Sequence, residues 1–129
     1  MGIDQIHESL SLFQFGKKTG IDIPGELGGI LPSREWKKLN KDEPWYRGET
    51  LITGIGQGFM TASPMQLALA TGAIANKGQL YTPRVLMHTQ SKNGESYHES
   101  MVQSKQIPIK DISNWDLIEK AMSCLLYTS

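Results

Sequence analysis

Hydrophobic residues near the start of the chain recur with helical spacing. Four of them lie three or four positions apart: Ile3, Ile6, Leu10 and Phe13. Residues with this spacing fall on one face of an α-helix. Gly16 follows, and glycine often occupies the left-handed position just past a helix end. The pattern predicts an amphipathic helix that buries one face and ends before Gly16.

The next part of the chain is marked by turn and cap signals. Residues 16–32 are rich in glycine and proline, which favours a turn-rich loop over regular elements. Ser33 can then cap a short helix that runs through Leu39. Residues 40–47 are polar apart from one proline and two aromatic residues, so we expect a surface loop anchored by those aromatic side chains.

The clearest helix start lies at Ser63-Pro64-Met65-Gln66. Serine is a favoured N-cap, proline suits the first helical position, and glutamine three residues after the cap completes a capping box. The helix is expected to run to Asn76, with Gly78 supplying the left-handed residue beyond its end. Its residues are small and apolar on most faces, which predicts burial.

The last third of the chain has the pattern of a hairpin followed by a helix. Residues 80–89 are β-prone, residues 91–94 contain an Asn-Gly turn signal, and residues 97–102 can return as the second strand. Ser113 with Asp116 three residues later predicts the start of a final helix. One face of that helix would carry three apolar side chains: Trp115, Ile118 and Met122.

Composition and charge narrow the possible functions. The 129 residues hold 13 Lys and Arg against 13 Asp and Glu, so the chain has no net field that would favour nucleic acid. Its hydrophobic share of 39% is ordinary for one globular domain or part of one. The most apolar window, residues 65–75, is far shorter than the roughly 20 residues that span a bilayer.

The single cysteine stands in an unusual C-terminal sequence. Cys124 alone allows neither a disulfide framework nor a cysteine-rich metal site. The segment Cys124-Leu125-Leu126-Tyr127-Thr128-Ser129 is what TGT-CTC-TTA-TAC-ACA-TCT encodes, and this DNA resembles a transposon end used to tag sequencing libraries. We therefore expect the natural sequence to end near Ser123, with residues 124–129 a translated adapter. The alternative is an ordinary apolar helix end.

Patterns typical of catalytic and metal sites are missing from the sequence. No serine has a lysine three residues later, and no glycine-x-serine-x-glycine elbow occurs. The three histidines lack zinc-ligand spacing and are interpreted as surface residues: His7, His88 and His98. The carboxylate pair Asp42 and Glu43 is interpreted as part of a solvated loop. We predict no catalytic, metal-binding or cofactor-binding residues in this chain.

Three short patterns match known sites only superficially. Lys18-Thr19-Gly20 has the lysine-threonine-glycine triplet of penicillin-reactive serine acyltransferases, and Ser91-Lys92-Asn93 fits serine-x-asparagine. Both fall in predicted turns, so we interpret both as solvated turns. Gly54-Ile55-Gly56-Gln57-Gly58 could suggest phosphate binding before a helix, but it lacks the dinucleotide and P-loop spacings. We favour glycines that let the backbone turn tightly and pack closely.

Several blocks of sequence follow one another in a distinctive order. They are Met1-Gly2-Ile3-Asp4, Phe15 to Glu26, Leu31 to Lys37, Pro44-Trp45-Tyr46-Arg47-Gly48-Glu49-Thr50, Gly54 to Gly58, Thr61 to Ala68, and Ala75-Asn76-Lys77-Gly78. In this order they resemble the penicillin-binding protein 2 family over nearly all of the chain to Met122. Residues 31–37 and 44–50 resemble its elongation-type branch in particular.

The resemblance implies a fold and a position within it. The fold is α+β, a partial penicillin-binding protein transpeptidase domain of the serine β-lactamase-like type, holding mainly helices and loops with one β-hairpin. Residues 1–123 are expected to lie between the family's serine-x-asparagine motif and its lysine-threonine/serine-glycine motif. The acylated serine would precede Met1, so no family catalytic residue is carried onto this chain.

The resemblance also implies the function of the parent protein. It would be a peptidoglycan D,D-transpeptidase of cell-wall elongation, acting on stem peptides, trapped by β-lactams, and working with a membrane glycosyltransferase of the elongation complex. An upstream membrane anchor and a periplasmic domain at the inner membrane are expected. This segment would be scaffold, inactive alone, and only marginally folded in isolation because most of the central sheet is missing.

Two other classes of function are compatible with the sequence. A non-catalytic binding or regulatory domain derived from such a protein would require a genuine start at Met1 and a genuine end at Ser129. An unrelated nucleotide-binding module would show thermal stabilisation by nucleotide.

Overall fold

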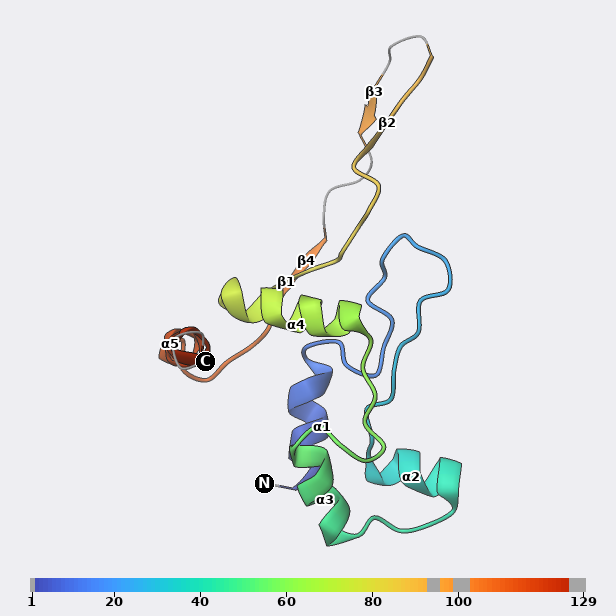
Figure 1. The fold of residues 1–129 in the computed structure, drawn as a ribbon, viewed down its shortest axis with the longest axis vertical. Helices are drawn as coiled ribbons and strands as arrows, with labels where there is room; N and C mark the ends of the chain where they lie inside the picture. The colour runs from blue at the N-terminus through green and yellow to red at the C-terminus, as the bar shows by residue number, and fades with distance from the viewer. Residues whose placement is uncertain (1, 93–95, 99–102, 126–129) are drawn as a thin grey trace. The chain divides into compact units, whose positions relative to one another are not determined.

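A computed structural model describes residues 2–92, 96–98 and 103–125 (Figure 1). In chain order the elements are α1 (Ile3–Ser11), α2 (Arg34–Lys41), α3 (Arg47–Gly54), α4 (Pro64–Ala75), β1 (Gln79–Tyr81), β2 (His88–Gln90), β3 (Ser96–His98), β4 (Ser104–Gln106) and α5 (Ser113–Leu125). The chain forms two compact units. The first unit comprises Met1–Thr19 and Leu27–Leu67, and the second comprises Gly20–Glu26 and Ala68–Ser129.

The helix starts predicted from serine caps are confirmed. The Trp36 amide donates to the Ser33 hydroxyl over 3.0 Å at the start of α2. At α4 the capping box closes from both sides: the Gln66 amide donates to Ser63 Oγ over 3.2 Å, and the Ser63 amide donates to Gln66 Oε1 over 2.9 Å. Local sequence was sufficient here because every partner lies within three residues.

The first helix ends earlier than predicted, and one helix was not predicted at all. Helix α1 stops at Ser11, and the chain continues in tight turns, with Gln14 at φ +70° and Gly16 at φ +76°. Helix α3 begins at Arg47, the last residue of the expected surface loop, and runs to Gly54. It starts where the Glu49 carboxylate accepts from the Tyr46 amide over 2.8 Å. Two glycines and two threonines in this segment have low helix propensity, which hides the helical signal.

Burial of α4 is less complete than its composition predicted. Ala70 and Ala73 are buried at 9% and 1% exposure, but Leu67 on another face is 55% exposed. The predicted left-handed residue past the helix is confirmed: Gly78 has φ +89°, and its amide donates to the Ala73 carbonyl over 2.7 Å. A side chain at Gly78 would collide with Trp115, so the glycine also permits close packing in the second unit.

The second unit contains the predicted hairpin, in two short ladders. Strand β1 pairs antiparallel with β4, with Leu80 opposite Lys105, and β2 pairs antiparallel with β3, with Thr89 opposite Tyr97. The expected continuous strand over residues 80–89 is wrong in its middle, because Pro83 has no amide hydrogen and interrupts the ladder. The predicted Asn-Gly turn at residues 93–94 lies outside the described residues.

Helix α5 is confirmed, although its cap differs from the prediction. Asp111 accepts from the Ser113 amide and hydroxyl over 2.9 and 2.8 Å, so Asp111 takes the part expected of Ser113. Trp115 is buried at 3% exposure, whereas Ile118 and Met122 remain 37% and 39% exposed. Among the described residues, the buried apolar side chains of the second unit are Ala70, Ala73, Leu80, Ile107 and Trp115.

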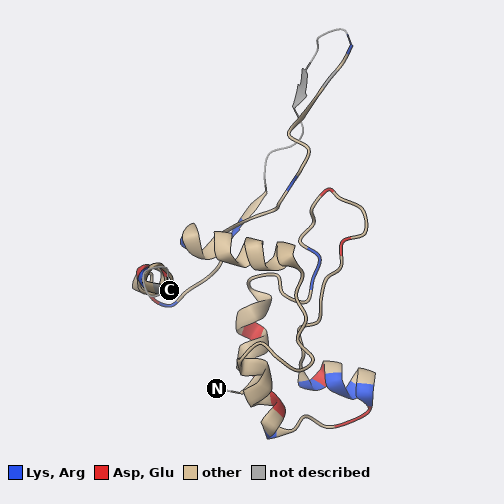
Figure 2. Ribbon diagram, in the orientation of Figure 1, with Lys and Arg blue, Asp and Glu red and all other residues tan. Residues whose placement is uncertain are grey.

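The first unit buries a charged side chain in its interior. Lys37 lies on α2, where four of the eight residues are basic (Figure 2), and is only 1% exposed. Its ammonium group pairs with Glu49 over 2.5 Å and with Glu43 over 3.3 Å, and lies 4.3 Å from the centre of the Tyr46 ring. Glu43 remains 59% exposed, as expected of a solvated loop, and also pairs with Lys37.

These contacts change the ionisation of the pair. Burial alone would lower the pKa of Lys37, but hydrogen bonds to Glu49 and Glu43 outweigh it and raise that pKa above its usual value. Burial likewise opposes ionisation of Glu49, yet hydrogen bonds from Lys37 and the Tyr46 amide hold its pKa below the ordinary value. The buried ammonium is thus neutralised by carboxylates that follow it in the chain.

The lowered pKa of Glu49 predicts acid sensitivity of the first unit. Its contribution to stability is complete above the unfolded-state pKa of about 4.3 and is lost as the pH falls through the lower folded-state pKa. We expect Glu49→Gln to reduce the melting temperature of the complete gene product at pH 7. Below about pH 4, the melting temperature of the variant should also change less steeply with pH than that of the wild type. Glu35→Gln, which alters an exposed carboxylate on α2, is the control. Parallel pH curves for the wild type and Glu49→Gln would contradict this assignment.

Candidate functional site

The structure places the catalytic look-alike triplets outside regular elements. Lys18-Thr19-Gly20 lies in an irregular segment after α1, with Lys18 exposed, Thr19 buried and Gly20 at φ +83°. Ser91 and Lys92 follow β2 in the turn region, while Asn93 lies outside the described residues. The described residues of both triplets therefore lie outside helices and strands.

The glycine-rich segment at residues 54–58 closes the end of a helix. Gly54 is the last residue of α3, and the amides of Ile55 and Gln57 donate to the Ile52 carbonyl over 3.3 and 3.0 Å. The Gly56 amide donates to the Thr53 carbonyl over 3.0 Å. Because these amides are engaged, and because a helix C-terminus carries partial negative charge, the segment is unsuited to cradling phosphate.

Glycine is favoured at positions 56 and 58 for different structural reasons. Gly56 has φ +73° and open space around its missing side chain, so the backbone conformation alone favours glycine. Gly58 has φ +78°, and a Cβ there would lie 3.1 Å from the Ile52 side chain. The expected tight turn is therefore found at both, and the expected close packing only at Gly58.

The Gln66 side chain makes several hydrogen bonds within the first unit. Its side chain is fully buried, and its Oε1 accepts from the Ser63 amide. Its Nε2 donates to three backbone carbonyls of the loop after α1, those of Gln14, Lys17 and Gly28, over 3.2, 2.7 and 2.7 Å. One carboxamide thus ties both ends of a turn-rich loop to the start of α4.

The loop can approach Gln66 closely because Gly29, which lies against it, has no side chain. Gly29 has φ +65°, and a Cβ there would collide with the Thr61 carbonyl oxygen and lie 3.0 Å from Gln66 Oε1. Beside it, Ile30 and Thr61 exchange backbone hydrogen bonds over 2.9 and 3.0 Å. The sequence indicated Gln66 as a cap, but its partners lie 38 to 52 positions away, where no local pattern reveals them.

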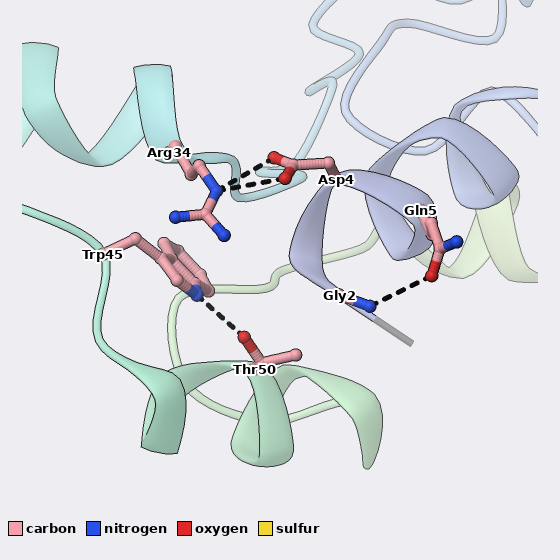
Figure 3. A network of polar contacts seen from close by, with 6 residues as sticks. All are labelled: Gly2, Asp4, Gln5, Arg34, Trp45 and Thr50. Atoms are coloured by element: carbon pink, nitrogen blue, oxygen red, sulfur yellow. Dashed lines mark hydrogen bonds and ion pairs between the residues drawn. The ribbon is translucent and has the colours of Figure 1, made fainter.

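The helices of the first unit are tied together by polar side chains (Figure 3). Arg34 on α2 pairs with Asp4 on α1 over 3.0 Å. The Trp45 indole nitrogen donates to the Thr50 hydroxyl over 2.9 Å, which anchors the loop between α2 and α3 as the aromatic pattern predicted. Trp36 on α2 also contacts Phe59, with ring centres 5.4 Å apart.

The histidines and acids show no metal-binding arrangement within the described part of the chain. No group of three or more His, Cys, Asp or Glu side chains there could hold a metal ion. His7 is half-buried rather than on the surface, and its Nδ1 lies 3.2 Å from the Pro32 carbonyl oxygen. Among the described residues, no helix has the length and apolarity to cross a bilayer.

Replacing Gln66 tests whether its amide holds the loop. Gln66→Glu keeps the shape but turns the donor toward the three carbonyls into an acceptor, so each carbonyl loses its partner at about 1–3 kcal/mol. We expect the free energy of unfolding of the complete gene product to fall by about 3 kcal/mol or more. Gln57→Glu, the same change at an exposed position, should alter it by less than about 0.5 kcal/mol. Similar effects at both positions would disprove the role of the amide.

Comparison with known proteins identifies the family to which the chain is similar. A family model described as "Penicillin binding protein transpeptidase domain" matches residues 1–123. The Escherichia coli protein "Peptidoglycan D,D-transpeptidase MrdA" is 39% identical over 124 residues, which cover 95% of this chain and 19% of that protein. The MrdA protein of Acinetobacter baumannii is 47% identical over 89 residues, covering 69% of this chain and 13% of its own length.

Solved structures agree with the sequence relatives. The crystal structure of Pseudomonas aeruginosa PBP2 in complex with WCK 5153 matches with a TM-score of 0.78 and 41% identity, over 94% of this chain and 27% of that one. PBP2 of Helicobacter pylori, in a complex with MreC, matches with a TM-score of 0.75 and 32% identity, over 92% of this chain and 20% of its own. The predicted α+β transpeptidase fold is thereby confirmed.

The chain spans about a fifth of the length of the curated relatives it matches. The match of the family model to residues 1–123 and the identity to the MrdA proteins nevertheless cover almost all of the chain. The chain therefore belongs to the penicillin-binding protein transpeptidase domain family.

Proposed function

We propose that this chain is a scaffold segment of a peptidoglycan D,D-transpeptidase of the elongation type, penicillin-binding protein 2. The observation that carries the proposal is the identity of 38% to 39% with proteins named MrdA over 95% of the chain. Residues 1–123 would lie between the serine-x-asparagine and lysine-threonine/serine-glycine motifs. The family model's match ends at residue 123, which supports the interpretation of residues 124–129 as adapter-encoded.

The complete protein would carry out acyl transfer at a serine outside this segment. That serine attacks the penultimate D-alanine carbonyl of a stem peptide, the bond to the terminal D-alanine breaks, and an acyl-enzyme forms. An amine of a neighbouring stem then attacks the ester, forms the crosslink and releases the serine. A β-lactam would acylate the same serine and remain bound.

The proposed part of this segment in that reaction is mechanical. Gln66 fixes the loop after α1, Lys37 fixes the chain between α2 and α3, and residues 54–58 end α3 in a set direction. The segment alone would neither crosslink peptides nor bind penicillin covalently. Several aliphatic side chains more than 70% exposed, among them Leu27, Leu51 and Ile55, support marginal folding in isolation.

Partners and location follow from the same proposal. The complete protein would be anchored in the inner membrane with its transpeptidase domain in the periplasm, and would act beside a membrane glycosyltransferase. A related chain from a solved "peptidoglycan synthase complex" of "polymerization and crosslinking", with a TM-score of 0.72 and 27% identity, supports such a partner. The alternative, a non-catalytic binding or regulatory domain, is not favoured, because the relatives are named as transpeptidases.

Reading the source DNA across both ends, by a library method without transposons, tests the proposed function. We expect serine-x-x-lysine to be encoded upstream and lysine-threonine/serine-glycine downstream, with Cys124 to Ser129 replaced. The complete product should then be labelled covalently by a fluorescent penicillin at the upstream serine, while the 129-residue chain is not. A ribosome-binding site directly before Met1 and a stop codon after Ser129 would overturn the proposal and favour the non-catalytic domain.

A valine at Gly56 tests the scaffold role of the glycine-rich segment. A β-branched residue at φ +73° is strained by about 1–3 kcal/mol, although there is space for its side chain. We expect Gly56→Val to lower stability by that amount and to slow penicillin acylation of the complete gene product. Gly54→Val, the same change at a position with helical backbone and open space, is the control. Undiminished stability and acylation in Gly56→Val would reject the role.

A further inference from the structure

The hairpin of the second unit needs support from outside its own strands. We call residues 79–106 the hairpin arm. It contains two ladders of three residue pairs each, β1 with β4 and β2 with β3. An isolated two-stranded hairpin is at best marginally stable in water, and ladders this short contribute few cross-strand contacts. The orientation of the distal ladder therefore depends on the chain between the ladders.

The chain between the ladders belongs to neither strand pair. Residues 82–87 separate β1 from β2, and the Thr82 amide extends the first ladder by donating to the Gln103 carbonyl over 2.9 Å. Pro83 offers no amide hydrogen. The amides of Val85 and Leu86 lie outside both ladders, in a segment that bends at Val85, and each needs a hydrogen-bond acceptor.

A single carboxylate from a distant part of the chain accepts both donors. Asp22 Oδ1 accepts from the Val85 amide over 2.7 Å, and Asp22 Oδ2 accepts from the Leu86 amide over 2.8 Å. These two amides lower the pKa of Asp22, so the carboxylate is charged at neutral pH. Charge-assisted hydrogen bonds of this length are stronger than neutral ones.

The loop that carries Asp22 is itself held in place. The Gly20 amide donates to Glu26 Oε2 over 3.1 Å, which closes the loop of residues 20–26. Gly20 has φ +83°, and a Cβ there would lie 3.5 Å from the Thr82 side chain, so the loop approaches the arm next to Pro83. This loop and the arm belong to the same compact unit.

We propose that Asp22 is a positioning residue that clasps the base of the hairpin arm and fixes the direction in which its distal ladder extends. When the two hydrogen bonds open, residues 82–87 and the distal ladder can reorient while the core around Ala73, Leu80 and Trp115 stays folded. The proposal does not depend on the enzymatic activity of the complete protein, because it rests only on contacts within the second unit.

Trypsin cleavage after Arg84 reports directly on the clasp. The amide of the Arg84–Val85 bond is one of the two that Asp22 holds, and the bond must leave Asp22 to enter a protease. In the complete gene product we expect cleavage there to be slow in the wild type, faster in Asp22→Asn and fastest in Asp22→Ala. The alanine variant should exceed the wild type by about tenfold or more, since it loses both acceptors.

A second cleavage site separates local opening from unfolding. Cleavage after Lys110 in the same unit should keep its wild-type rate, and Asp42→Asn, which changes an exposed acid of the first unit, should leave both rates unchanged. If the Asp22 variants are cleaved faster to the same degree after Arg84 and after Lys110, Asp22 stabilises the whole unit. If cleavage is not faster at either site, Asp22 does not hold residues 82–87. Either result overturns the clasp.

Hydrogen exchange tests the clasp without any substitution. In the unmodified protein the amides of Val85 and Leu86 should exchange at least tenfold more slowly than unstructured amides, because each is bound to a carboxylate oxygen. Exchange of both amides at the unprotected rate would reject the proposal, whatever the variants do.

Discussion

The buried carboxamide of Gln66 is the interaction on which the first unit depends. Its four hydrogen bonds reach the cap of α4 and three carbonyls of the loop after α1. A loop rich in glycine and proline cannot satisfy its own inward-facing carbonyls by regular pairing. Glutamine solves this problem because it offers a donor group and an acceptor on one short, uncharged side chain. The helix start and the loop are therefore specified together.

Lys37 and Asp22 are charged side chains that hold irregular segments in place. Lys37 fills interior space with its aliphatic stem and is neutralised by Glu43 and Glu49, which follow it in the chain. Asp22 supplies acceptors where a proline has broken a ladder. In each case a polar side chain fixes a segment that has no regular secondary structure. Such contacts explain how a chain of this length keeps its turns ordered.

The sequence was most informative where the partners are close in the chain. Ser33 and Ser63 cap α2 and α4 as predicted, and Gly78 ends α4 as predicted, because each interaction spans a single turn. Helix α3 was missed because its glycines and threonines have low helix propensity and its start depends on Glu49 rather than on a serine. The partners of Gln66, Lys37 and Asp22 could not be predicted, since periodicity carries no information about contacts between distant segments.

The long reach of Gln66 has a consequence for synthesis of the protein. Lys17 and Gln66 are 49 positions apart, so the loop after α1 has no amide to bind until Gln66 has been made. At about 5–20 residues per second, that interval is roughly 2–10 s. Throughout it, the glycine-rich loop is a nascent chain without its hydrogen-bond donor. The residue that completes this unit is thus nearly the last of it to emerge.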